Sequence, residues 1–284
     1  MRFKAKLVEI SCILHFSRVV STVSHMAKSC ALRLTPNKLY FILNDTAAQG
    51  GVTIWCEVNQ SGLFEEFRIE GNEGSNDNIY LELHPDNLVK AMKCAANAQV
   101  VKIKLTKKIT PCLTFEIILP SMVRSRTVTH DTPVTVIAQN QWDAYQEPQM
   151  PEIDVSMCMP PLKTVRNIVD KMKHFSSQLV ISANRSGQMT LKVVTDMVSA
   201  TTRFSGLDIE DIGRGDSVRS NSSGNSSQEM SEATVDIKKL SAFLHGQLVS
   251  PTKVICNIVH QRAVQFYLIH DDFSLQYFIP AIVT

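Results

Sequence analysis

The sequence lacks the motifs with which nucleotide-binding and hydrolytic enzymes hold their substrates. Its 284 residues contain no Walker loop, no G-x-G-x-x-G and no nucleophile motif. Two short groups, His130-Asp131 and His270-Asp271-Asp272, could belong to a metal phosphohydrolase or nuclease. Such a site needs several ligands converging from helices, whereas both groups fall in or beside expected strands. We therefore expect no catalytic residue, no metal and no cofactor.

Paired cysteines and long apolar runs are also missing. The seven cysteines are scattered and never form a C-x-x-C pair, which argues against a disulfide framework and a zinc knuckle. Each has apolar neighbours, so we expect each to be a small buried side chain. No run approaches the ~18 apolar residues of a membrane helix. Residues 1–7 alternate apolar and cationic types, unlike a signal peptide. We expect no membrane contact and a nuclear or cytosolic location.

What the sequence does contain is a series of short strands interrupted by amphipathic helices. A 3.6-residue apolar period predicts helices over 12–27 and from Pro85 onward. Alternation and turn residues predict the strands between them. In the first half these are 1–7, 30–34, 39–43, 52–58, 64–69, 79–83, 100–105, 112–119 and 127–137.

The same order of elements returns after residue 151. Strands are expected at 153–159, 179–183, 189–194, 198–204, 254–259, 264–269 and 275–279, with helices on the stripes Leu162–Phe175 and Leu240–Leu248. The stretch 138–151 is polar, has two prolines and reads as a linker. This repeat predicts an α+β fold of two similar domains, 1–137 and 152–284, each with two helices packed on antiparallel sheets.

One insertion breaks the repeat. Residues 206–231 are rich in Ser, Gly, Asn and Asp and have few apolar side chains, so we expect a mobile loop. A regulatory phosphorylation loop is the functional alternative. Its candidate serines are Ser217, Ser220, Ser222 and Ser223.

The expected helices hold the positive charge of the chain. Over 11–29, 85–99, 161–177 and 236–250 the net charges are +2, +1, +3 and +1, while the whole chain carries only +2. The strands and loops are therefore acidic. In the first helix a polar face opposite the apolar stripe holds His15, Arg18, Thr22, His25 and Lys28, and in the third it holds Lys163, Arg166, Asp170 and Lys173. The faces are either solvated or a sequence-blind surface for phosphates.

Several segments resemble the Hus subunit of the Rad–Hus–Rad (nine-one-one) DNA-damage checkpoint clamp, from the first residues to nearly the last. They are Met1-Arg2-Phe3-Lys4-Ala5-Lys6, Gly50-Gly51-Val52 with Trp55-Cys56-Glu57, Tyr80-Leu81-Glu82-Leu83, Thr129-His130-Asp131, Pro251-Thr252-Lys253 with Cys256-Asn257-Ile258-Val259, and Ser274-Leu275-Gln276-Tyr277-Phe278-Ile279-Pro280-Ala281. The insertion 206–231 shows least likeness.

The resemblance implies the sliding-clamp fold of the proliferating cell nuclear antigen, with three chains per ring and helices around the central hole. It implies two other clamp-like Rad subunits, double-stranded DNA, an ATP-dependent clamp loader, and checkpoint and repair factors as partners. The implied location is the nucleus, with cytoplasm before assembly. The implied DNA-facing cations are Arg18, Lys28, Lys90, Lys93, Lys163, Arg166, Lys171, Lys173, Lys238 and Lys239.

The resemblance also implies subunit contacts made by strand addition. The two implied edges, 127–137 and 198–204, include Thr127, Thr129, Val134 and Val136, and Val198, Thr201 and Phe204. In the linker, Trp142 and Tyr145 would border a groove for partner peptides, or else Trp142 only anchors the linker to the sheet. Two alternatives for the whole chain stay open: a homotrimeric replicative clamp, and a scaffold that does not bind nucleic acid.

Overall fold

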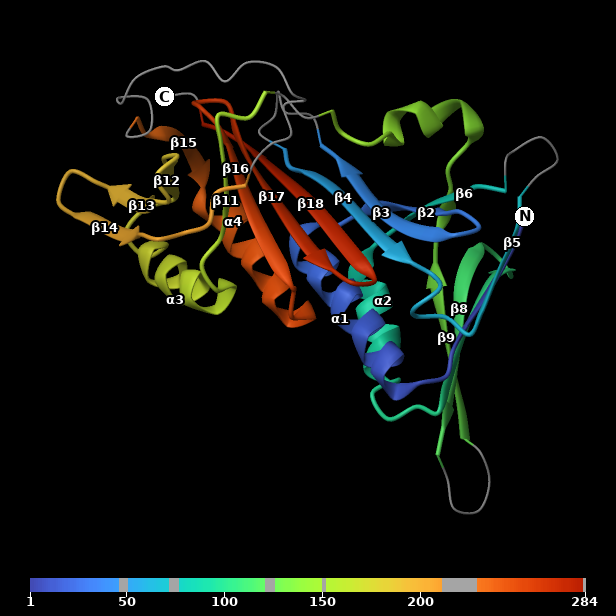
Figure 1. Cartoon of the computed structure of the whole chain (residues 1–284). Coiled ribbons are helices and arrows are strands. Elements are labelled where there is room, and N and C mark those ends of the chain that lie inside the picture. Colours follow the sequence, from blue (N-terminus) through green and yellow to red (C-terminus); the bar gives the residue numbers. More distant parts are fainter. Residues whose placement is uncertain (46–50, 72–76, 121–125, 150–151, 211–228, 283–284) are drawn as a thin grey trace. The chain divides into compact units, whose positions relative to one another are not determined.

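The computed structural model describes residues 1–45, 51–71, 77–120, 126–149, 152–210 and 229–282 (Figure 1). The chain forms two compact units, each described here by itself. Unit 1 consists of Met1–Leu43, Trp55–Glu147 and Asp271–Ser274. Unit 2 consists of Asn44–Ile54, Pro148–His270 and Leu275–Thr284.

Unit 1 is built from two sheets and two α-helices. One sheet has the strand order β5-β1-β7-β8-β9, and the other contains β10-β6-β2-β3-β4. The elements are β1 (Arg2–Leu7), α1 (Ile10–Met26), β2 (Cys30–Leu34), β3 (Lys38–Asn44), β4 (Thr53–Asn59), β5 (Glu66–Glu70), β6 (Ile79–Leu83), α2 (Pro85–Lys93), β7 (Val100–Lys107), β8 (Pro111–Leu119), β9 (Arg126–Pro133), β10 (Thr135–Val136) and the 3₁₀ helix η2 (Gln139–Tyr145).

Unit 2 has the same kinds of layers. Its sheets have the strand orders β14-β13-β12-β15 and β18-β17-β16-β11. The elements are β11 (Val155–Cys158), α3 (Leu162–Met172), β12 (Gln178–Ala183), β13 (Met189–Val194), β14 (Ser199–Phe204), β15 (Ser231–Asp236), α4 (Ile237–Phe243), the 3₁₀ helix η3 (Leu244–Val249), β16 (Lys253–Val259), β17 (Ala263–His270) and β18 (Phe273–Pro280).

Each unit interlocks two strand–helix–strand motifs. The strand before each helix pairs antiparallel with the first strand after the other helix: β1 with β7, β6 with β2, β11 with β16, and β15 with β12. This exchange of strands brings the two helices of a unit together, so α1 packs against α2 and α3 against α4 (Figure 1). Each pair of helices therefore presents a common surface.

The helices form where apolar residues recur at helical spacing. Phe16, Val19, Val20 and Val23 of α1 are buried. In α2 the proline at the first helical position matches the preference of helix starts, because its missing N–H would have no intrahelical acceptor there. In α4 the Asp236 carboxylate caps the helix by accepting a hydrogen bond from the Lys238 amide at 2.8 Å.

Aromatic packing fixes α4 on its sheet. The Phe243 ring stacks on Phe266 and Tyr277, with centroid distances of 4.6 and 5.7 Å. The Tyr277 hydroxyl donates a hydrogen bond to the Lys239 carbonyl at 3.2 Å, and burial raises the pKa of Tyr277. The position of the α4 backbone, and of the lysines it bears, is thus set by the core of unit 2.

Several predicted elements are wrong in part. Strand β15 was not predicted, because only Ala233 and Val235 of its six residues are buried apolar side chains. The single strand expected over 127–137 is two strands in different sheets, β9 and β10. The helix expected through Leu248 ends as η3, and Leu248 is exposed, as is Phe175 beyond α3.

The described ends of the segment 206–231 form contacts with the rest of unit 2. Residues 206–210 lie along β11, where the Cys158 amide donates to the Asp208 carbonyl at 2.8 Å and the Glu210 amide to the Ser156 carbonyl at 3.0 Å. Ser231 begins β15. The four candidate phosphorylation serines lie outside the described residues.

The cysteines are not all buried. Cys30, Cys56, Cys112 and Cys256 are buried as expected, and burial raises the pKa of Cys30 and Cys256 to about 12. Cys12 and Cys158 are half-buried and Cys94 is exposed. Cys94 directly follows α2 and is exposed although Met92 and Ala95 on either side are buried, so its apolar neighbours misled the prediction.

Candidate nucleic-acid interface

The cations expected on unit 1 lie on or just after its two helices. Arg18 of α1 and Lys28, two residues beyond its end, are exposed, as are Lys90 and Lys93 in the last turn of α2. The predicted polar face of α1 is wrong at one position, since Thr22 is completely buried. It points into the unit because the apolar stripe of this long helix is wide.

The cations on α3 are partly neutralised by one acid. Asp170 lies 2.6 Å from the Lys173 ammonium and 3.7 Å from the Arg166 guanidinium. The hydrogen bond from Lys173 holds the pKa of Asp170 below its usual range, with Arg166 adding to the effect. Asp170 therefore carries its charge at neutral pH. Lys163 and Lys171 are exposed on the same helix.

The cations of α4 are at its start. Lys238 is exposed and Lys239 is half-buried. Six cations of unit 2 thus lie on two adjacent helices or directly after one of them. Lys163, Arg166 and Lys171 are on α3, Lys173 follows α3, and Lys238 and Lys239 are on α4.

Several cations on the strands are paired with acids, although others, such as Lys102 and Lys192, have no ion pair within the described residues. Lys4 and Arg68 lie 3.0 and 3.1 Å from Glu66, Lys104 lies 2.8 Å from Glu116, and Lys38 binds Glu57 at 2.6 Å. Within the described part of the chain, no ion pair is found for Arg18, Lys28, Lys90, Lys93, Lys163, Lys171 or Lys238. Unpaired, exposed cations on neighbouring helices are suited to phosphate groups.

The two predicted interface strands end their sheets. β9 is the last strand of the five-stranded sheet, and β14 is the last of the four-stranded one. Thr127 and Thr129 on β9 and Thr201 on β14 are exposed, whereas Phe204 is half-buried.

Three predicted edge residues do not lie on these edges. Val134 is buried, and its amide donates to the Pro111 carbonyl at 3.0 Å. Val136 belongs to β10 and pairs with Leu81 in the other sheet of unit 1. Val198 lies in the turn before β14.

The linker begins as a helix that packs on unit 1. Trp142 stacks on Tyr80, with ring centroids 4.5 Å apart and an interplanar angle of 26°. Its indole N–H donates to the Ile137 carbonyl at 3.1 Å. Tyr145 also contacts Tyr80, at a centroid distance of 6.2 Å. Both residues are half-buried, so Trp142 anchors the linker on unit 1 while part of its surface stays open.

The residues that suggested a hydrolase have structural partners. Asp131 binds the Lys108 ammonium at 2.5 Å and the Thr114 hydroxyl at 2.6 Å. These contacts, led by the one to Lys108, hold the pKa of Asp131 below its usual range. In the described parts of the chain, no three histidine, cysteine or acidic side chains are grouped as metal ligands would be. None of the helices seen there is long and apolar enough for a membrane span.

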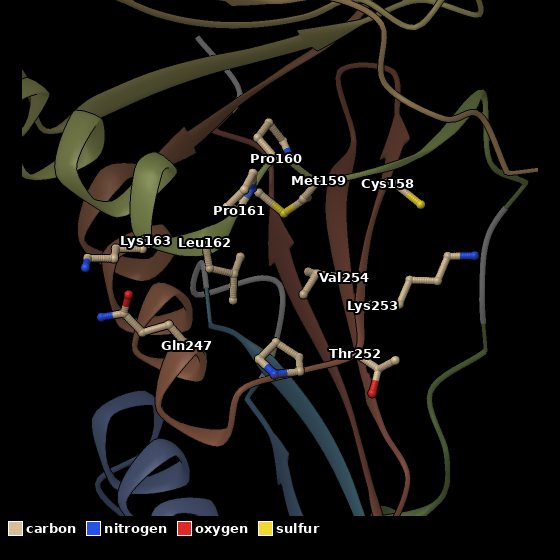
Figure 2. Close-up of a pocket in the computed structure, with 11 residues that line it drawn as sticks. Cys158, Met159, Pro160, Pro161, Leu162, Lys163, Gln247, Thr252, Lys253 and Val254 are labelled. Atoms are coloured by element: carbon tan, nitrogen blue, oxygen red, sulfur yellow. The ribbon is translucent and has the colours of Figure 1, made fainter.

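A pocket of about 420 Å³ in unit 2 lies between the end of β11, the start of α3 and the start of β16 (Figure 2). Met159, Leu162 and Val254 supply apolar walls. Lys253 also lines it, but its ammonium lies 2.7 Å from Glu210. The Glu210 carboxylate further accepts a hydrogen bond from the Cys158 thiol at 3.2 Å. Two of the residues at this pocket, Lys253 and Cys158, therefore already bind Glu210.

Comparison with known proteins places these features in a family. The family model described as "Hus1-like protein" matches residues 1–283. The human "Checkpoint protein HUS1" is 47% identical over 283 residues, which cover 99% of this chain and 100% of the relative. The "Checkpoint protein hus1" of Schizosaccharomyces pombe is 31% identical over 224 residues, covering 75% of this chain and 76% of that protein.

A solved structure shows the same fold at low sequence identity. The crystal structure of "Proliferating Cellular Nuclear Antigen from Entamoeba histolytica" matches with a TM-score of 0.72 and 14% identity, covering 99% of both chains. The predicted α+β sliding-clamp fold is confirmed. The chain belongs to the Hus1-like protein family and is a non-catalytic subunit of a checkpoint clamp.

Proposed function

We propose that this chain and two clamp-like Rad subunits close a heterotrimeric ring around double-stranded DNA at damage sites. An ATP-dependent loader, a separate protein, places the ring, which then recruits checkpoint signalling and repair factors in the nucleus. That the chain works in a multi-subunit clamp follows from its family and fold. That the clamp encircles DNA, is placed by a loader and recruits these factors is our proposal.

The observation that carries the proposal is the gathering of exposed, unpaired cations on the packed helices of each unit. Within the described residues, Arg18, Lys28, Lys90, Lys93, Lys163, Lys171 and Lys238 lie on or just after these helices and have no ion pair. Such cations release condensed counterions from duplex DNA without reading bases, which allows a ring to slide. The proposed DNA-facing set is the ten cations from Arg18 to Lys239 named above.

Subunit contacts are proposed at the two terminal strands. An edge strand has a row of unpaired backbone groups, which a neighbouring subunit's edge satisfies by strand addition. We assign this role to β9 through Thr127 and Thr129, and to β14 through Thr201 and Phe204. The proposed clamp domains are 1–137 and 152–284, and Trp142 and Tyr145 border the proposed partner surface beside the linker 138–151.

The mass of the purified chain in solution separates the heterotrimer from the homotrimeric replicative clamp. We expect a particle near the chain mass of 31.7 kDa when it is alone and a complex of three chains only when both partners are added. Size-exclusion chromatography with light scattering measures this. A stable trimer of the chain alone would contradict the proposal and favour the replicative clamp.

A further inference from the structure

Arg33, one residue before the end of β2, lies between two tyrosines from the strands on either side. In the strand registers Arg33 is opposite Tyr40 of β3 and also opposite Tyr80 of β6. The centre of its guanidinium is 5.1 Å from the Tyr40 ring centroid and 5.5 Å from the Tyr80 centroid. Both rings therefore hold the cation by cation–π contacts.

Among the described residues the guanidinium has no anion to bind. Its Nε atom is buried with no hydrogen-bond partner in that part of the chain, and no ion pair joins Arg33 to any residue there. Glu57, on β4 of the same unit, is already used: it accepts hydrogen bonds from the Lys38 ammonium at 2.6 Å and the Trp55 indole at 2.9 Å. A guanidinium has five N–H donors, and an unmet buried donor is costly.

The surroundings of Arg33 are rigid and aromatic. Tyr40 packs against Trp55 at a centroid distance of 5.2 Å, and Tyr80 carries the stacked Trp142 of η2. Arg33 itself is only half-buried, so part of it reaches the surface beside η2. Ring contacts use the faces of a guanidinium and leave its N–H edge for an acceptor in its own plane. A planar carboxylate fits that edge through two parallel hydrogen bonds.

We propose that Arg33 is the anion receptor of the partner surface beside Trp142 and Tyr145. Its ligand is the carboxylate of an aspartate or glutamate in an extended peptide of a partner protein. An apolar residue of the same peptide packs on the exposed parts of Trp142 and Tyr145. This inference rests on the partner surface proposed above and gives it a chemical specificity, which is an acidic residue next to an apolar one.

Selection of random heptapeptides on phage against the full chain tests the proposal. Enriched peptides are expected to contain an acidic residue, and each is then made with that residue as the amide. Binding measured by calorimetry should weaken about 10- to 100-fold for Arg33→Gln, since a charge-assisted bidentate contact is lost. The amide peptide should lose as much on the unchanged chain and nothing further on Arg33→Gln. Arg262→Gln, an exposed arginine of unit 2, is the matched control and should bind normally.

Two further variants separate this inference from the partner surface itself. Arg33→Met loses the two ring contacts together with the charge, so peptide affinity is the readout rather than the unfolding temperature. Its affinity should fall as far as that of Arg33→Gln, and full affinity would overturn the proposal. Trp142→Ala should weaken the same peptides. If Trp142→Ala weakens peptide binding and Arg33→Gln does not, the partner surface is supported and the role of Arg33 is contradicted. If neither variant weakens binding, both proposals are contradicted.

Discussion

Replacing Lys163, Arg166 and Lys173 by glutamine is expected to weaken the hold of the assembled clamp on duplex DNA on the order of 100-fold at 0.15 M salt. Each phosphate contact contributes about 0.9 to the slope of log K against log salt, so the slope should fall by about 2 to 3. Fluorescence anisotropy on a linear duplex, whose free ends let the ring thread without a loader, measures both quantities.

Replacing Asp170 on the same helix should change DNA affinity in the opposite direction. Its carboxylate lies 2.6 Å from Lys173 and 3.7 Å from Arg166 and so competes with phosphate for both. Asp170→Asn should strengthen DNA binding and raise the salt slope by up to about 1. If these side chains only supported the fold, the triple glutamine variant and Asp170→Asn would not change the DNA affinity in opposite directions.

The matched control for these variants removes three exposed cations of unit 2 that are not on helices. Arg185, Lys192 and Arg262 are exposed in the turn after β12, on β13 and in the turn before β17. With these three residues replaced by glutamine, the slope of log K against log salt should stay within about 1 of its value for the unchanged clamp. Equal losses for the two triple variants would mean that only net charge matters, and no loss for the helix variant would favour a scaffold that does not bind nucleic acid.

Proline in β14 is expected to disrupt the ring without unfolding the chain. In an antiparallel edge strand the amides point alternately to the neighbouring strand and outward. Thr201 and Thr202 are adjacent and pair with Lys192 and Leu191 of β13. One of their two amides therefore points to β13 and the other outward, so one of the variants Thr201→Pro and Thr202→Pro removes an outward amide. That variant should lose about 3 kcal/mol of assembly free energy, roughly 100-fold in affinity for the partner subunit.

Light scattering with the partner subunits, alongside thermal unfolding of the chain alone, checks this result. Thr201→Ala and Thr202→Ala keep both amides and should assemble normally. If the proline variant that still folds also assembles with full affinity, β14 is not a subunit edge.

Most strands and helices could be predicted because their core faces are regular. In α3 the buried residues Leu162, Val165, Val169 and Met172 keep helical spacing, and in β18 four alternate residues from Phe273 to Ile279 are buried. These patterns report which face meets a core. They do not show which strand is the neighbour, and for that reason β9 and β10 were predicted as one strand although β9 ends at Pro133.

The candidate site was harder to predict, because charge balance depends on neighbours far apart in the sequence. Glu66 neutralises Lys4 across 62 residues, and Glu116 neutralises Lys104 across a strand pair. Asp170 was visible beside Arg166 and Lys173, yet only the structure shows that it binds both. Arg33 gave no local signal at all, since its ring partners come from the strands on either side.

The burial of Trp142 also depends on a residue far away in the sequence. A tryptophan in a polar linker with two prolines suggests an exposed binding residue, whereas its indole is stacked on Tyr80 of β6. The stacking partner is 62 positions away, and nothing near residue 142 predicts it. The partner surface we propose is therefore the exposed part of a packed aromatic cluster rather than a free side chain.

Photo-crosslinking tests most directly whether the helices of both units contact DNA. A benzophenone amino acid is placed singly at Arg18, Lys90, Lys171 or Lys238, one position on each helix, and at the strand residues Lys104 and Lys192 as controls. Illumination of the clamp on circular duplex should link all four helix positions to DNA and neither strand position. Crosslinks from the strand positions, or from the helices of only one unit, would contradict a DNA channel lined by all four.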